Sequence, residues 1–287
     1  MRRRIFLLGA AALVSASAWS AAARFERGVL WRVTRRGAAP SHIFGTIHEP
    51  APLPAPAAAA FDASKTLLVE FLPEAYSRER FLEASLLPEG RSLEALIGAE
   101  DFARAVEQLT PAGLPRELIA RLKPWAALIN LRRGAAPDAP TLDAEITARA
   151  RARRMTVFQM EGVEEQIFTF DEAPLESQLA LLRHSLAHRA ELDELARHTL
   201  AAYLERDLAR IARLREEFAA RHPEVAAHQA LMTRRIVYDR SVVMAFRMQR
   251  ELRRGEAFVA LGALHLHGEK GVLALLEQDG FRSARVY

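Results

Sequence analysis

The spacing of hydrophobic and polar residues predicts strands near both ends of the chain. Six segments have the continuous or alternating apolar pattern of strands: Gly28–Thr34, Ser41–Ile47, Lys65–Phe71, Met155–Met160, Phe258–Leu261 and Phe281–Val286. The first two flank a Gly37–Pro40 turn, which favours a hairpin. The third is almost wholly apolar, as expected of a strand that is buried on both faces.

The middle of the chain has the spacing of helices. Helices are predicted at Arg78–Leu87, Ser92–Leu96, Asp101–Leu109, Pro115–Arg133, Thr141–Arg153 and Lys270–Gln278. After Pro174 at its start, the segment 174–253 contains a single proline, Pro223, so two or three long helices that break at His222-Pro223 are predicted there. Because strands lie at both ends, we expect one mixed α/β (α+β) domain over residues 24–287. Its central mixed sheet would be built from both ends of the chain around a large helical insertion.

Composition narrows the classes of protein and of site. The chain has 287 residues, of which 50% are hydrophobic and 26% charged, so it can bury a core. It has no cysteine, which excludes disulfides, iron–sulfur clusters, thiolate zinc sites and a cysteine nucleophile. A metal ion would therefore have to be held by His, Asp or Glu.

Residues 1–23 have the pattern of an export signal. Arg2–Arg4 are followed by the apolar run Ile5–Val14 and then by small residues. The run is about half as long as a membrane span requires, so we expect cleavage, no remaining span, and a periplasmic or secreted protein. An uncleaved anchor is the alternative. Arg3-Arg4 also resembles a twin-arginine signal, and ordinary export stays open beside it.

The charge of the mature chain gives little reason to expect a nucleic acid partner. The whole chain has a formal charge of +4, and removal of Arg2, Arg3 and Arg4 leaves +4 − 3 = +1. Binding to a phosphate backbone relies on many Lys and Arg contacts, so this balance argues against it.

Two Gly-x-x-His motifs follow predicted strands near opposite ends of the chain. They are Gly45–His48 and Gly262–His265. Glycine at a strand end allows a tight turn or a close approach of the backbone, and the histidine would then lie at the edge of the sheet. The alternative is that each histidine only packs or caps locally.

Two glutamates end predicted strands in the same way. Glu70 follows Leu67–Val69 and Glu161 follows Met155–Met160. A carboxylate next to an apolar run is costly to bury without a partner, so each either points to solvent or serves a site. Two histidines and one or two carboxylates match the ligands of zinc, manganese or cobalt in hydrolases, and a spare carboxylate would be the general base.

These motifs together resemble the TraB/GumN family, whose animal relatives include the Tiki metalloproteases. The matching segments are Leu30-Trp31-Arg32-Val33, Phe44-Gly45-Thr46-Ile47-His48, Val69-Glu70, Leu142-Asp143, Met160-Glu161 with Glu164-Glu165-Gln166, Asp239-Arg240, and Gly262-Ala263-Leu264-His265-Leu266 with Gly268 and Gly271. The resemblance implies a mixed α/β fold like that of erythromycin esterases and ChaN-like proteins. By analogy with the Tiki branch it also implies metal-dependent peptide hydrolysis.

The resemblance assigns the functional core to His48, Glu70 and His265, with Glu161 and Arg240 at further motif positions. The sequence departs from the family pattern in two places. Glu49-Pro50 stands where an acidic residue usually follows the first histidine, and Arg240-Ser241 stands where Arg-Asn is usual. The arginine is kept and the amide is lost.

Other histidines have simpler interpretations. His184 and His188 lie four residues apart on one predicted helix face, but Ser185 replaces the glutamate of a His-Glu-x-x-His motif. We interpret them as a solvated or core-packing pair. Three interpretations of His267 stay open: it supports the metal ligands, it is an additional ligand, or its side chain points away from the site.

The sequence thus predicts an exported metal-dependent hydrolase, a peptidase acting on peptide or protein substrates. His48, Glu70 and His265 would bind a divalent Mn, Co or Zn ion. Glu70 or Glu161 would transfer the proton, and Arg240 would pair with a carboxylate or stabilise an oxyanion. The alternatives are a metal-free esterase-like hydrolase, a periplasmic haem- or metal-binding protein, and an interaction protein without catalysis. The sequence does not determine the oligomeric state.

Overall fold

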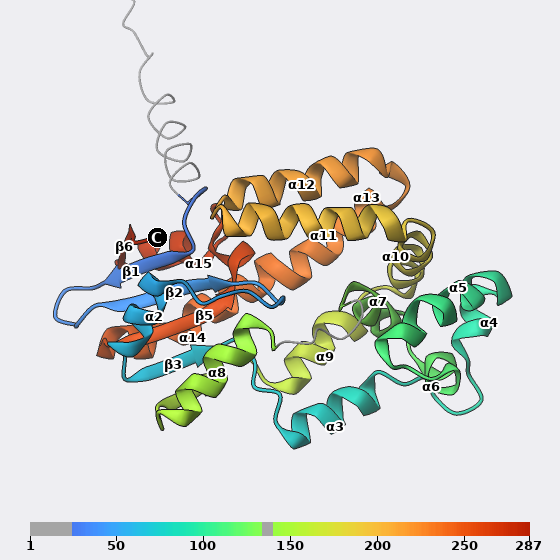
Figure 1. The fold of residues 1–287 in the computed structure, drawn as a ribbon, viewed down its shortest axis with the longest axis horizontal. Coiled ribbons are helices and arrows are strands. Elements are labelled where there is room, and N and C mark those ends of the chain that lie inside the picture. Colours follow the sequence, from blue (N-terminus) through green and yellow to red (C-terminus); the bar gives the residue numbers. More distant parts are fainter. Residues whose placement is uncertain (1–24, 134–139) are drawn as a thin grey trace, which may run out of the picture.

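The computed structural model describes residues 25–133 and 140–287 (Figure 1). The predicted export signal, residues 1–23, lies outside the described residues. Within the described ranges, no helix has both the length and the apolar character needed to cross a membrane.

The centre of the molecule is one six-stranded mixed sheet in the order β4-β3-β5-β2-β1-β6. The strands are β1 (Leu30–Thr34), β2 (Ser41–Thr46), β3 (Thr66–Val69), β4 (Thr156–Gln159), β5 (Ala257–Gly262) and β6 (Arg282–Arg285). β4, β3, β5 and β2 are parallel, and β1 pairs antiparallel with β2 and β6. The hairpin and the sheet built from both chain ends are confirmed.

Helices cover both faces of the parallel strands. From β2 the chain crosses the sheet toward its β4 edge, first to β3 and then to β4, with α2 (Ala55–Asp62) before β3 and α8 (Leu142–Ala152) before β4. It then crosses back toward the middle of the sheet, and α14 (Arg240–Arg254) leads into β5. Right-handed crossovers in opposite directions place α14 on the opposite face from α2 and α8. This explains why every residue from Ala257 to Leu261 in β5 is buried.

A second apolar core lies apart from the sheet (Figure 1). Its buried residues come from α4 (Leu93–Ile97), α5 (Ala99–Leu109), α6 (Arg116–Arg121), α7 (Pro124–Arg133), α10 (Leu175–Ala187) and α13 (Pro223–Thr233), and α3 (Ala75–Ala84) and α9 (Val163–Asp171) pack against it. The helices α11 (Arg189–Leu204) and α12 (Leu208–Arg221) pack on the core of the sheet instead. A π-helical segment, Arg234–Asp239, leads from α13 into α14. A 3₁₀ turn, Ala263–Leu266, follows β5, and α15 (Val272–Gln278) precedes β6.

The prediction of one helix over Pro115–Arg133 is wrong. α6 ends at Arg121 and α7 begins at Pro124, with Leu122 extended between them. Pro124 disfavours helical geometry in the residue before it, Lys123, so the helix ends ahead of this pair. The N–H of Lys123 instead donates to the carbonyl of Ser85, 2.8 Å away.

Residues 174–253 also contain more helices than predicted. The break at His222-Pro223 is confirmed, but the segment has five α-helices, α10 to α14. It also breaks at His188 and at Arg206-Asp207, and the π-helical segment Arg234–Asp239 separates α13 from α14. Arg206 adopts a positive φ of 61°, and the Asp207 side chain accepts from the Arg210 N–H to cap α12. His188 leaves helical geometry at φ −112° and ψ 35°.

Candidate active site

The candidate residues follow the carboxyl ends of the four parallel strands. In the order of the sheet, Glu161 follows β4, Glu70 follows β3, His265 follows β5 and His48 follows β2. Ligand sites in open α/β sheets lie at this edge, where the chain direction reverses. We call Glu161, Glu70, His265 and His48, together with Arg240 at the start of α14, the strand-end site.

The glycines of the two Gly-x-x-His motifs allow close packing at this edge. A Cβ on Gly45 would lie 2.7 Å from Leu266 Cδ1 and 2.9 Å from Ala263 Cα, so no side chain fits there. A Cβ on Gly262 would lie 3.2 Å from Glu70 Oε1, 3.5 Å from His265 Cδ2 and 4.0 Å from His48 Nε2. The three side chains therefore converge over the backbone of Gly262.

His48 is held from behind by Asp143. Its Nδ1 lies 2.9 Å from Asp143 Oδ2, and Thr46 Oγ1 donates to Asp143 Oδ1 over 2.5 Å. The hydrogen bond and charge of Asp143, helped by the charge of Glu70, raise the pKa of His48 to about 9 although desolvation opposes this. The His48 side chain is 72% exposed, so this side of the site is open to solvent.

His265 is buried and fixed through Ser241. The Ser241 hydroxyl donates its one proton to the Val237 carbonyl and lies 2.9 Å from His265 Nδ1. Nδ1 must therefore carry the imidazole proton, which leaves a lone pair on Nε2. Burial lowers the pKa of His265 to about 4 despite the charge of Glu70, so this ring is neutral at neutral pH.

Glu70 lies between the two histidines and Arg240. Its Oε1 accepts from the Gly262 N–H over 2.5 Å and is 3.8 Å from His265 Nε2. Its Oε2 accepts from Arg240 Nη2 over 2.5 Å. Burial opposes ionisation, but the charges of His265, Arg240 and His48 and the Gly262 N–H lower the pKa of Glu70 to about 2.

Arg240 joins the two glutamates. Its Nε is 3.0 Å from each oxygen of Glu161, and its Nη2 donates to Glu161 Oε2 over 2.6 Å. Gln166 also donates to Glu161, which is only 3% exposed. Burial raises the pKa of Glu161 while Arg240 opposes that shift, and the glutamates raise the pKa of Arg240 although burial opposes this. Arg240 is therefore the permanent positive charge of the site.

The donor chemistry suits a metal ion, but the donor atoms are not yet gathered around one point. Neutral imidazole nitrogens and a carboxylate oxygen are ligands that zinc, manganese and cobalt accept. The donor atoms of the strand-end site are too far apart to form a ligand cluster in this structure. Among the described residues, such a cluster, with ligand atoms within 4.8 Å of one another, is found at His184, His188, His222 and Glu224. A metal at the strand-end site would require the exposed His48 side chain to move inward.

The other predicted histidines lie away from this edge. His184 is buried and His188 half-buried between helices, and both rings contact His222, a partner that helical spacing did not reveal. His267 is half-buried, and Glu26 and Glu216 are among the charges that act on it. Neither observation gives these histidines a part in the strand-end site.

Two residues of the site had no role assigned from the sequence. Asp143 belongs to a motif and follows the cap Thr141, but only the fold shows that α8 brings it to His48. The N–H of Leu142 donates to the Glu49 carbonyl, which ties the two segments together. Ser241, where the expected amide is absent, supplies a hydroxyl oxygen to His265 instead.

Comparison with protein families assigns the chain to a family. The model of the TraB/PrgY/gumN family matches residues 29–285, which is nearly the whole described chain. The chain belongs to the TraB/PrgY/gumN family. The family match includes all four strand-end residues and Arg240. Comparisons with curated proteins and with solved structures give no match.

Proposed function

We propose that this member of the TraB/PrgY/gumN family is a hydrolase whose active centre is the strand-end site. The proposal assigns it peptide or protein substrates and a divalent ion held by His48, Glu70 and His265. The observation that carries it is the state of the two imidazoles. Each has Nδ1 bound to an oxygen, at Asp143 or Ser241, which leaves Nε2 as the nitrogen on the side of Glu70. His265 Nε2 already has a free lone pair, whereas His48, with a pKa of about 9, must release its Nε2 proton when an ion binds.

This arrangement is the one that metal-binding histidines usually have. Their second ring nitrogen donates to a carboxylate or another oxygen, which fixes the ring orientation and makes the ligand nitrogen more basic. Glu70 contributes the negative charge, and its low pKa keeps it ionised throughout the neutral range. A divalent ion bound there would polarise a substrate carbonyl and acidify a water molecule.

The two glutamates then have different roles. Glu161 is occupied by Arg240 and Gln166, so we assign it the positioning of Arg240. A carboxylate can accept about four hydrogen bonds, and Glu70 accepts two, from Gly262 and Arg240. The remaining lone pairs allow Glu70 to act as a ligand. Its pKa of about 2 makes it a weak proton acceptor, so the acidified water molecule would lose its proton to solvent rather than to Glu70. Arg240 stabilises the charge on Glu70 throughout.

A metal-free hydrolase is the second candidate, and the spread of the donor atoms favours it. His48 with Asp143 behind it has the form of a general base and its orienting carboxylate. In this mechanism His48 Nε2 takes the proton from water and no ion is needed. Because the pKa of His48 is about 9, only the fraction of His48 that has lost its proton is active, and activity should rise as the pH approaches 9.

A hydrolysis assay separates these candidates. The protein is purified without chelator or nickel and tested on a peptide library with Mn²⁺, Co²⁺ or Zn²⁺, before and after treatment with a chelator. The metal-dependent mechanism predicts cleavage that the chelator abolishes, that added metal restores, and that His48→Ala and His265→Ala each reduce by about 100-fold or more. His198→Ala, at an exposed position on α11, is the control.

The other outcomes are equally clear. If the chelator leaves peptide cleavage unchanged but His48→Ala abolishes it, the metal-free hydrolase is supported. No cleavage under any of these conditions, or full activity in both histidine variants, contradicts the proposal.

Export is part of the proposal and rests on the pattern of residues 1–23. The test is fractionation of cells that express the full chain or a chain without residues 2–23. We expect the full chain to be found outside the cytoplasm in a shortened form, and the chain without residues 2–23 to stay in the cytoplasm. Equal amounts of both chains in the cytoplasm would contradict export.

A further inference from the structure

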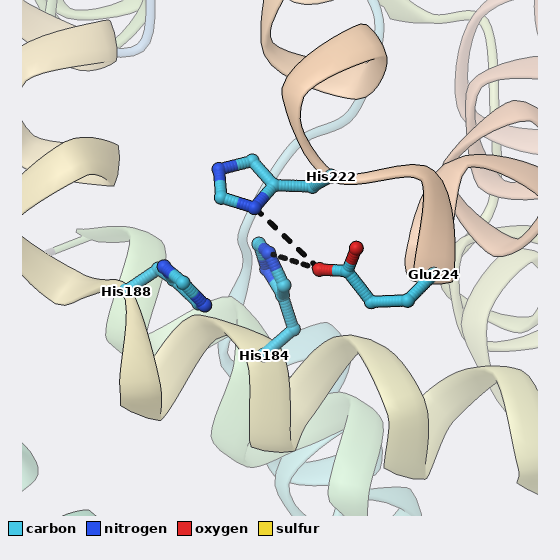
Figure 2. Close-up of side chains that lie close together, drawn as sticks. All are labelled: His184, His188, His222 and Glu224. Atoms are coloured by element: carbon cyan, nitrogen blue, oxygen red, sulfur yellow. Dashed lines mark ion pairs between the residues drawn. The ribbon is translucent and has the colours of Figure 1, made fainter.

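Three histidines and a glutamate meet where two pairs of helices join. His184 lies on α10, and His188 is the residue between α10 and α11. His222 is the residue between α12 and α13, and Glu224 is in the first turn of α13. Figure 2 shows the four side chains directed toward one another. We call these four residues the helical cluster.

The spacing of the helical cluster matches that of ligands around one small ion. One ligand atom from each residue lies within 4.8 Å of all the others. Glu224 Oε1 is 3.5 Å from His184 Nε2 and 3.5 Å from His222 Nδ1 (Figure 2). These separations are longer than good hydrogen bonds. A tetrahedral ion with bonds of about 2.1 Å separates its ligand atoms by about 3.4 Å, close to these values.

One buried nitrogen of the helical cluster has no hydrogen-bond partner. The His184 side chain is only 5% exposed, and its Nε2 lacks any hydrogen bond within the described ranges. Buried polar atoms are almost always hydrogen-bonded, and an orphan of this kind calls for an additional partner. Glu224 Oε1 lies 3.5 Å from this nitrogen, so an ion bound between them would supply the missing partner.

Glu191 holds two of the rings from outside. Its two oxygens lie 2.9 Å from His188 Nδ1 and 3.0 Å from His222 Nε2. These contacts leave His188 Nε2 and His222 Nδ1 as the nitrogens available to a ligand. A carboxylate that binds the second nitrogen of ligating histidines is the usual outer support of a zinc site.

We propose that His184, His188, His222 and Glu224 form a zinc site that is separate from the strand-end site. Three imidazoles and one carboxylate complete a tetrahedral shell, and a complete shell of protein ligands is typical of structural zinc. The ion would fasten the junction of α10 and α11 to that of α12 and α13. The exposed Glu224 and the half-buried His188 give it a route of entry. This inference does not depend on the proposed hydrolase activity.

A zinc competition titration tests the site. The full-length protein and a His48→Ala variant, which disables the strand-end site, are titrated with Zn²⁺ against a chromophoric chelator. In the His48→Ala background we expect about one tight equivalent of Zn²⁺, and a rise in Tm when zinc is added. His188→Gln and Glu224→Gln should each weaken this binding by at least about 10-fold.

Matched controls keep the test independent of folding. His188 and Glu224 are partly exposed, so their variants should keep the far-ultraviolet circular dichroism of the wild type. His198→Gln, an exposed histidine on α11 that pairs with Glu194, should bind zinc as tightly as the parent. Cobalt in place of zinc should give the visible spectrum of a tetrahedral complex, which His188→Gln should lose.

Two results would overturn the proposal. The first is the lack of a tight equivalent in the His48→Ala background. The second is zinc affinity that is unchanged in folded His188→Gln and Glu224→Gln.

Discussion

The strand-end site and the helical cluster have similar side chains in opposite environments. At the strand-end site, both carboxylates are bound to Arg240, each histidine has an oxygen behind it, and His48 is largely exposed. In the helical cluster, four donors lie within 4.8 Å of one another and His184 Nε2 is buried without a hydrogen bond.

The difference between the two regions matches the two roles that we propose, catalysis at the strand-end site and stabilisation at the helical cluster. Catalytic metal sites keep three protein ligands and an open position, whereas structural sites close the shell with a fourth. The strand-end site offers three ligands on a rigid sheet edge with access from solvent. The helical cluster offers four ligands at two helix junctions.

The largest effect should come from the central cation of the strand-end site. Arg240→Met leaves Glu70 and Glu161 buried without their positive partner. Removing one partner of a buried ion pair costs about 3–5 kcal/mol, which denaturant unfolding measures directly. Arg149→Met breaks an exposed pair with Glu145 on α8 and should cost less than about 1 kcal/mol. Equal losses in the two variants would show that Arg240 is not the centre of the site.

A pH effect should follow from buried His265. Its pKa is about 4 in the folded protein and near the ordinary 6.5 in the unfolded chain, so the unfolded state binds more protons between these values. Stability should therefore fall as pH decreases from 6.5 to 4, by up to about 3 kcal/mol from this group. Unfolding of His265→Asn across this range should show a shallower dependence. Parallel curves for the variant and the wild type would contradict the assignment.

The outer carboxylates of the two regions provide a matched pair of variants. Asp143→Asn should reduce hydrolysis by about 10- to 100-fold, while Glu191→Gln should weaken zinc binding at the helical cluster by a similar factor. Neither variant should affect the other site. Asp143→Asn should also lower the pKa of His48 from about 9, because the hydrogen bond and charge that raise it are lost. Titration of the His48 ring by NMR checks this direction.

The smallest effect distinguishes the two motif glycines. Gly45→Ala would press its new methyl group against the backbone of Ala263 and should cost about 1 kcal/mol of stability. Gly262→Ala would meet Glu70 Oε1 at 3.2 Å, so it should reduce hydrolysis more than stability. Thermal unfolding and the peptide assay on both variants test this division, and the reverse pattern would count against it.

Patterns that are local in sequence predicted much of the fold. The apolar runs located the strands, and both Gly-x-x-His motifs fall where parallel strands end side by side. The glutamates after β3 and β4 were found because a carboxylate at the end of an apolar run needs a partner.

Contacts between distant segments escaped the same reasoning. The break before Pro124 is completed by a hydrogen bond to Ser85, and the support of His48 comes from Asp143, 95 residues away. The spacing of His184 and His188 showed one helix face, but their partner His222 lies on another pair of helices. Periodicity reports which face of an element is buried, and it carries no information about which side chain it meets there.

The central claim is that the strand-end site holds a metal ion for hydrolysis. The most direct measurement is anomalous X-ray diffraction from crystals of the protein loaded with cobalt. The account predicts an anomalous peak bounded by His48 Nε2, Glu70 and His265 Nε2, and its loss in His48→Ala, whose crystals should still show the peak at the helical cluster. Cobalt-loaded wild-type crystals without a peak at the ends of β2, β3 and β5 would contradict the claim.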